Sequence, residues 1–156
     1  MAKAILICGK ICTGKSTYAE NLRKQEKAVI LSCDEITLAL FDENLGDRHE
    51  EVTAKTQKYL FEKSLEVLEA GANVILEWGF WTENSRLNAK KFYTENNFEC
   101  ELHYLDISDE EWEKRISKRN TAKSDGETIA YYVDKNLAEK CISLFEKPTE
   151  YDVCVK

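Results

Sequence analysis

Residues 8–17 read CGKICTGKST, and this stretch decides the fold. Within it, Gly9 opens the pattern G-x-x-x-x-G-K-[ST], which Gly14, Lys15 and Ser16 complete. The apolar run AKAILIC precedes the pattern, and a segment with helical spacing of its apolar residues follows it. Glycines between a strand and a helix let the backbone curl, so that successive N–H groups point inward at an anion. The stretch therefore predicts a loop that holds the phosphates of a nucleoside triphosphate.

Three features of this loop suit phosphate chemistry. The helix that begins near Lys15 presents its positive end to the anion. The Lys15 ammonium can reach the β- and γ-phosphates, and the Ser16 hydroxyl can ligate Mg²⁺. A tight turn with an exposed lysine is the alternative, but such a turn does not require Lys followed by Ser. We expect ATP and Mg²⁺ as cofactors, although the sequence contains no base-reading motif that distinguishes ATP from GTP. The residues expected to contact the nucleotide are Gly9, Cys12, Thr13, Gly14, Lys15, Ser16 and Thr17.

Strands and helices alternate along the rest of the chain. The runs KAVILSCD, ANVILEWG, FECELHYLDI and YDVCVK predict four more strands, the first of them buried. Helices are expected over 35–41, about 50–70 and 82–96, from 108 onward, and up to Lys147-Pro148, with Thr82 and Ser108 as caps. This alternation predicts an α/β protein, a three-layer P-loop NTPase fold with a five-stranded parallel sheet. We expect one domain, 1–156, with a short helical lid at about 112–126.

Composition narrows the class of protein. Hydrophobic residues make up 43% and charged residues 33% of the 156 residues, as in ordinary globular proteins. A net charge of −7 argues against broad nucleic-acid affinity. No apolar run reaches the length of a membrane span, and six cysteines without C-x-x-C spacing predict reduced, mostly buried thiols. We expect a cytoplasmic protein without a membrane partner, present as a monomer or weak dimer.

Asp34 follows the second predicted strand directly. The carboxyl ends of parallel strands line one crevice, so Asp34 should face the phosphate-binding loop across it. A carboxylate there can accept the proton of a substrate hydroxyl that attacks the γ-phosphorus. The alternative is that Asp34 caps a helix beginning at Glu35.

The third predicted strand ends in Glu77, where an acid can hold Mg²⁺ directly or through water. Three aromatic residues, Trp78, Phe80 and Trp81, surround the end of this strand, and either form a wall for a substrate ring or pack in the core. Arg86 lies one turn into the next helix. It either meets a phosphate or is a solvated helix residue. We predict substrate contacts for Asp34, Glu77, Trp81 and Arg86, and metal contacts for Ser16 and Glu77.

The segment WEKRISKRN places Arg115 and Arg119 four residues apart, on one face of a helix. It is the one concentrated basic segment of an acidic chain. Its guanidinium groups can close over the nucleotide and offset charge on the phosphoryl group in transfer. A surface helix with internal ion pairs is the alternative. We predict Lys15, Asp34, Arg115 and Arg119 as the catalytic residues.

Together, GKICTGKS, SCD, VILEWGFW with Arg86, and LDISDEEWEKRISKRN resemble the small P-loop kinases related to chloramphenicol phosphotransferase, the kinase half of polynucleotide kinases, and zeta toxins. The resemblance implies that Asp34 is the general base and that Arg115 and Arg119 are the lid arginines. Glu77 departs from the usual Asp, and no substrate signature can be assigned.

The leading hypothesis is an ATP-dependent phosphotransferase that acts on a hydroxyl of a small molecule. A polynucleotide 5′-hydroxyl kinase is an alternative, which the acidic stretch after Asp34 disfavours by repulsion. A non-catalytic ATP-binding or sensing module is another. A nucleoside monophosphate kinase is disfavoured because Arg48 is the single arginine between Asp34 and Ala70.

Overall fold

The computed structural model describes residues 1–42, 45–126 and 133–156. The elements, in chain order, are β1 (Lys3–Cys8), α1 (Lys15–Glu26), β2 (Ala28–Leu31), α2 (Cys33–Phe41), the 3₁₀ turn η1 (Gly46–Arg48), α3 (His49–Glu69), β3 (Asn73–Gly79), α4 (Glu83–Glu95), β4 (Glu99–Leu105), α5 (Asp109–Ser124), α6 (Lys135–Leu144) and β5 (Val153–Val155).

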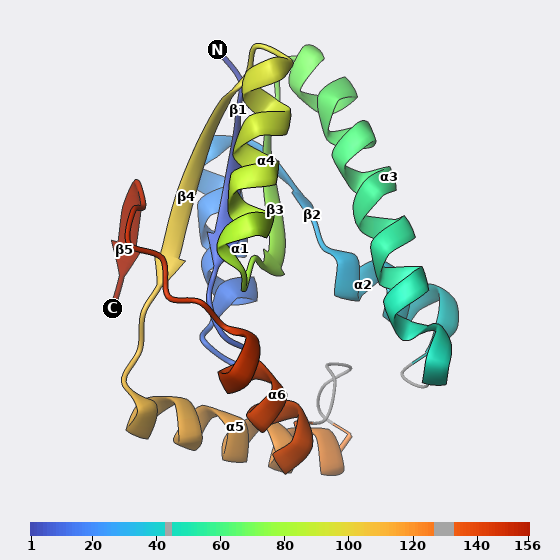
Figure 1. Ribbon diagram of the computed structural model, residues 1–156, viewed down its shortest axis with the longest axis vertical. Helices are drawn as coiled ribbons and strands as arrows, with labels where there is room; N and C mark the ends of the chain where they lie inside the picture. The colour runs from blue at the N-terminus through green and yellow to red at the C-terminus, as the bar shows by residue number, and fades with distance from the viewer. Residues whose placement is uncertain (43–44, 127–132) are drawn as a thin grey trace.

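All five strands are parallel and lie in the order β2-β3-β1-β4-β5 (Figure 1). The predicted α/β fold with a five-stranded parallel sheet is confirmed. Because β1 is central, the loop after it emerges in the middle of the carboxyl edge. The prediction that the second strand is buried was wrong in part: β2 is an edge strand, and the Val29 side chain is 41% exposed.

The sheet separates two hydrophobic clusters. On one face Leu6 and Leu76 pack with Leu60 of α3 and Tyr93 of α4. On the other face the neighbouring residues of the same strands pack against α1. Helices α5 and α6 lie beyond the carboxyl edge of the strands (Figure 1). Among the described helices, none combines the length and apolar character that crossing a bilayer needs.

Local signals place most helix ends. The Thr82 and Ser108 hydroxyls accept backbone N–H groups in the first turns of α4 and α5, as predicted. Helix α6 ends at Leu144, before the predicted Lys147-Pro148, because Phe145 adopts an extended conformation. All six cysteines are free thiols. Part of the predicted lid region, 112–124, lies in α5.

Candidate active site

The phosphate-binding loop is shaped by two positive φ angles and by a glycine with no room for a Cβ atom. Cys12 and Gly14 have positive φ angles of 58° and 91°. A Cβ atom added to Gly9 would come within 2.7 Å of Thr13 Oγ1. The Gly9 N–H donates to the Gly79 carbonyl at 3.0 Å, which ties the loop to the end of β3. Because the φ angle is positive at alternate residues of this part of the loop, its consecutive N–H groups point to one side, as anion binding requires.

Helix α1 begins without a side-chain cap, since no side chain of Gly14 can accept its first N–H groups. By contrast, Ser32, Thr82, Ser108 and Asp134 cap α2, α4, α5 and α6. Uncapped N–H groups and the helix dipole together favour an anion at this end. The Lys15 ammonium donates to the carbonyls of Lys10 (2.6 Å) and Gly9 (3.2 Å) at the same place. Desolvation lowers the pKa of Lys15, and Glu77 opposes this shift.

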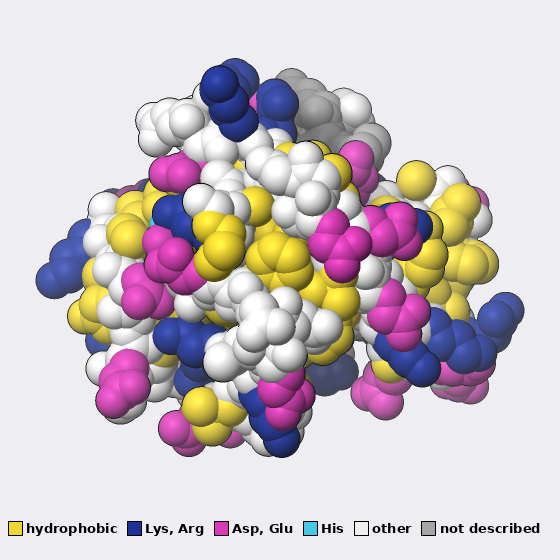
Figure 2. Space-filling model, turned by 90° about the horizontal axis from the view of Figure 1, so that it is seen from above, with side chains coloured by type: hydrophobic (Ala, Val, Ile, Leu, Met, Phe, Trp, Pro, Cys, Tyr) yellow, Lys and Arg dark blue, Asp and Glu magenta, His cyan; other side chains and the backbone are white. Residues whose placement is uncertain are grey.

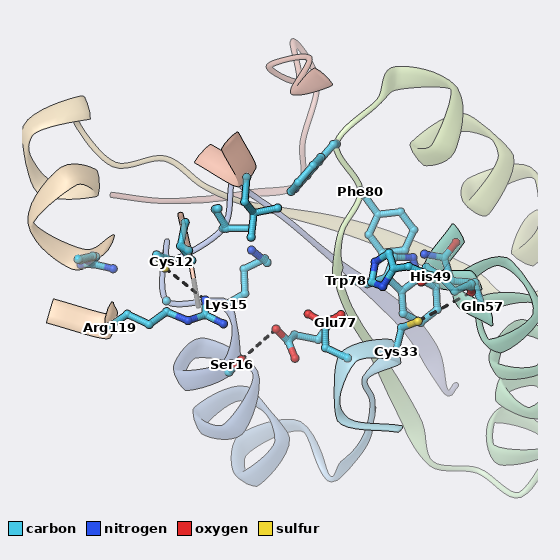
Figure 3. Close-up of a pocket in the computed structure, with 18 of the residues that line it drawn as sticks. Cys12, Lys15, Ser16, Cys33, His49, Gln57, Glu77, Trp78, Phe80 and Arg119 are labelled. Carbon is cyan, nitrogen blue, oxygen red and sulfur yellow. Dashed lines mark hydrogen bonds between the residues drawn. The ribbon is translucent and has the colours of Figure 1, made fainter. Parts of the chain in front are cut away.

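Ser16 and Glu77 meet, although 61 residues separate them in sequence. The Ser16 hydroxyl donates to Glu77 Oε1 at 3.0 Å (Figure 3). Burial raises the pKa of Glu77, while Lys15 and the bond from Ser16 lower it. Two oxygen donors side by side form the start of a site for a hard cation. Within the described ranges, no group of three His, Cys, Asp or Glu side chains could hold a metal.

Asp34 lies in the first turn of α2 and faces the same cavity. Ser32 caps this helix, so the interpretation of Asp34 as the cap was wrong. Asp34 is exposed to the open cavity, yet the surrounding walls desolvate its carboxyl. This desolvation raises the pKa of Asp34, and the positive charge of Lys15 and Arg119 counteracts it.

Helix α5 is bonded to the phosphate-binding loop along its length. Trp112 Nε1 donates to the Ile11 carbonyl at 2.6 Å, and Arg115 Nη1 donates to the Thr13 carbonyl at 2.9 Å. Arg119 Nη1 lies 3.2 Å from the Cys12 sulfur. Arg119 Nε is buried and has no hydrogen-bond partner among the described residues. The alternative of a surface helix with internal ion pairs holds in part, because Arg115 Nε also donates to Glu111 at 2.8 Å, while Arg115 Nη1 and Arg119 Nη1 reach the loop.

A cavity of about 970 Å³ brings these groups together at the carboxyl edge of the sheet (Figure 3). This volume falls at the upper end of small-molecule sites. Of the predicted site residues, ten line the cavity: Cys12, Gly14, Lys15, Ser16, Thr17, Asp34, Glu77, Trp81, Arg115 and Arg119. Gly9 and Thr13 lie behind the loop surface, where they shape it.

Arg86 is not part of the cavity wall. It is only 6% exposed, so its interpretation as a solvated helix residue was wrong. Its Nη1 atom donates to the carbonyls of Phe80 (2.8 Å) and Trp81 (3.2 Å). The structure therefore brings Arg86 to the backbone of Trp81, but it does not place the guanidinium group in the cavity wall.

The aromatic residues both line the cavity and pack. The Trp78 and Phe80 rings stack with centroids 5.2 Å apart, and Phe61 meets Trp78 edge-on at 5.4 Å. Phe80 belongs to the core cluster and still reaches the cavity wall, as does Trp78. The two interpretations of this segment are therefore compatible.

Sequence reasoning missed the contribution of α3. His49, Thr53 and Gln57 recur every fourth residue and line the cavity together. The signal was available, because three polar side chains at this spacing share one helix face. What the sequence lacked was evidence that this face turns toward the loop.

The AAA domain family matches residues 5–139. The chain belongs to this family. No curated protein matches the sequence. The predicted relationship to small P-loop kinases is confirmed by the family match and by solved structures with the same fold.

Three solved structures illustrate the likeness. The Mycobacterium tuberculosis APS kinase CysC, in complex with AMPPNP and APS, is 18% identical, with 99% of this chain and 87% of that chain covered and a TM-score of 0.71. A chain of the Pnkp1/Rnl/Hen1 RNA repair complex is 24% identical, with 92% and 43% covered and a TM-score of 0.72, so this protein spans less than half of that chain. A gluconokinase from Sinorhizobium meliloti 1021 is 14% identical, with 98% and 80% covered and a TM-score of 0.64. At these identities the comparison shows a kinase-like P-loop fold.

Proposed function

We propose that the protein is an ATP-dependent kinase that transfers the γ-phosphoryl group to a hydroxyl of a small molecule. The observation that carries this proposal is the position of Asp34. Its carboxyl faces a cavity that also contains Lys15, Ser16 and the arginines of α5. A nucleotide sensor needs the loop, but it has no use for a carboxylate across from the phosphates.

The nucleotide is assigned to the loop and to α5. Backbone N–H groups of the loop and the start of α1 hold the β- and γ-phosphates, and the Lys15 ammonium pairs with them. Arg119 supports this assignment, because its buried Nε has no hydrogen-bond partner among the described residues and a phosphate oxygen would supply one. Arg115 braces the loop through Thr13 and contributes positive charge beside it.

The Ser16 and Glu77 oxygens fit Mg²⁺, which takes few protein ligands and completes its shell with phosphates and water. When bound, Mg²⁺ would neutralise charge on the phosphate oxygens. The residues of this chain then orient the acceptor and handle its proton.

In the transfer step the acceptor O–H bond breaks, and its proton passes to the Asp34 carboxylate. The acceptor oxygen bonds to the γ-phosphorus while the bond to the β-phosphate oxygen breaks, which releases ADP. The raised pKa of Asp34 strengthens it as a proton acceptor. Closing of the α5 region as a lid would keep water away from the phosphoryl group.

The test is the transfer of γ-labelled phosphate from ATP and Mg²⁺ into a fractionated pool of metabolites. The wild type should produce a labelled small molecule, Asp34→Asn should lower the rate by about 10²–10⁴-fold, and Lys15→Ala should abolish it. Asp42→Asn is the matched control, because Asp42 ends the same helix, is exposed and lies outside the cavity wall.

Three results would contradict the proposal. Full activity of Asp34→Asn would remove Asp34 from the mechanism. ATP binding without any labelled product, from metabolites or from 5′-hydroxyl oligonucleotides, would favour a sensor. Labelled oligonucleotides alone would assign the enzyme to polynucleotides.

A further inference from the structure

We propose that the acceptor is a hydroxyl compound that carries no anionic group and presents a flat apolar face to Trp78 and Trp81. This inference rests on the proposed kinase function and names the substrate class of the same site. The distribution of charge, aromatic rings and hydrogen-bonding groups around the cavity carries it.

Positive charge is confined to one side of the cavity. Among the described lining residues, every Lys and Arg belongs to α1 or α5: Lys15, Arg115, Lys118 and Arg119. The stretches outside the description, 43–44 and 127–132, contain no Lys or Arg in their sequence. The single arginine between Asp34 and Ala70, Arg48, is exposed and does not line the cavity. The cations on the loop side are needed by the nucleotide.

The opposite side would repel an anion. There Asp34 contributes a carboxylate, and the exposed acids Asp47 of η1 and Glu50 of α3 flank the exposed Arg48, which lies outside the cavity wall. A phosphate, sulfate or carboxylate placed against this side would lose its water without gaining a lysine or arginine partner. His49, the remaining basic side chain of this wall, already acts on Asp34 and lowers its pKa.

An aromatic surface forms the floor on this side. Trp78 stacks on the Phe80 ring and contacts the Phe61 ring at an interplanar angle of 85°, so packing determines its orientation. Trp81 also lines the cavity. Rings held in this way favour a ligand with a flat apolar face, such as a nucleobase, a phenyl group or the face of a sugar.

The polar groups beside the rings suit neutral hydroxyls. Gln57 and His49 of α3 lie next to Trp78 and Cys33 (Figure 3). The Gln57 amide and the Thr53 hydroxyl have no hydrogen-bond partner among the described residues, whereas Thr82 and Ser85 of α4 bond to each other's backbone. An amide and a hydroxyl can donate and accept at once, which matches hydroxyl groups better than it matches an anion.

The fold does not impose this preference. The APS kinase structure, in complex with AMPPNP and APS, has a similar fold at 18% identity. The preference for a neutral acceptor is therefore inferred from the cations that line the cavity of this chain and not from its fold.

The experiment compares matched compounds that differ by one anionic group. Adenosine is paired with adenosine 5′-monophosphate, and phenyl β-glucoside with phenyl β-glucuronide. Each compound is titrated into the wild type saturated with AMPPNP and Mg²⁺, and binding is followed by tryptophan fluorescence. The same titration of Trp78→Phe shows whether the fluorescence change comes from Trp78. ADP release with ATP is measured in parallel. At least one neutral compound should bind at least about tenfold more tightly than its anionic counterpart.

A charge-placement variant sharpens the test. Gln57→Arg adds a cation to the acceptor wall and should reduce the neutral preference at least about tenfold while AMPPNP affinity is unchanged. Ala54→Arg is the matched control, because Ala54 is exposed on the same helix and outside the cavity wall. It should leave the preference as in the wild type.

Tighter binding of the anionic members, or no quenching by any neutral member, would overturn the inference. An equal effect of Ala54→Arg and Gln57→Arg would also overturn it. Failure of the proposed function looks different: neutral compounds would quench fluorescence, but neither ADP nor a phosphorylated product would form. Phosphorylation of the anionic members alone would keep the kinase and reject this substrate class.

Discussion

Replacing Gly79 with Ala tests how the end of β3 supports the phosphate-binding loop. Gly79 has a φ of 89°, and its carbonyl accepts the Gly9 N–H at 3.0 Å. An added Cβ atom would lie 2.8 Å from Trp81 Nε1 and 3.2 Å from the Gly9 carbonyl oxygen. Gly71, just after α3, has the same φ of 89° but nothing within 4 Å of an added Cβ. Gly71→Ala is therefore a matched control for the backbone angle.

The two variants differ by one physical contribution. Left-handed backbone costs an alanine about 1–2 kcal/mol, and reduced freedom of the unfolded chain offsets about 0.4–1 kcal/mol of that. Gly71→Ala should therefore lower the free energy of unfolding by about 1 kcal/mol. Gly79→Ala adds overpacking of about 1–3 kcal/mol, for a total of about 2–4 kcal/mol. At this chain length each kcal/mol shifts the Tm by about 2–4 °C.

The assay is thermal unfolding of both variants, followed by titration with AMPPNP and Mg²⁺. Gly79→Ala should show the larger loss of Tm and weaker nucleotide binding, because the shifted Gly9 carbonyl belongs to the loop. Gly71→Ala should bind AMPPNP as the wild type does. Equal losses of Tm would refute the reasoning, since they would mean that Trp81 and the loop move aside without cost.

Three further predictions concern single side chains. Tyr93→Phe should lower the free energy of unfolding by about 1 kcal/mol in urea titrations, because it removes a buried 2.8 Å bond to Ser64, whose hydroxyl keeps a second bond to a main-chain oxygen. Asp34→Asn should stabilise the protein. Folding raises the pKa of the Asp34 carboxyl, so the wild type loses stability as pH rises through that pKa, whereas the amide of the variant does not titrate. The Tm of the variant should therefore exceed that of the wild type by an amount that grows between pH 4 and pH 7.5. A Tm difference independent of pH would contradict this assignment. Arg119→Lys should reduce kcat by about 10²–10³-fold with little change in Tm, because Arg119 Nε has no partner among the described residues; a large loss of Tm would show a structural role instead.

Much of the fold follows from local patterns. Apolar runs that end in glycine or an acid predict strands, and caps such as Thr82 need only a three-residue spacing to be recognised. The contact between Ser16 and Glu77 also follows, because parallel strands end at one edge whatever their order. The edge position of β2 cannot be predicted from local patterns, because it depends on the order of the strands in the sheet. As a result, Val29 is exposed although its apolar run predicts a buried strand.

The acceptor wall shows a second limit. His49, Thr53 and Gln57 share a face of α3 by spacing alone. Their place in the cavity depends on how α3 packs over the sheet, through residues such as Leu60 and Leu68. Packing of this kind is set by contacts between distant segments, which no local pattern contains.

Arg86 is an arginine whose charge predicts a phosphate contact, but whose hydrogen bonds go to backbone carbonyls because of the local backbone geometry. The chain leaves β3 through Gly79 and Phe80, both with positive φ, so the carbonyls that follow no longer point along the strand ladder. Buried carbonyls need donors, and Arg86 supplies Nη1 to those of Phe80 and Trp81. In doing so it supports the segment that carries the aromatic wall. Arg86 thus acts on the site through the backbone, which explains how an arginine near a phosphate loop can be buried without facing the phosphates.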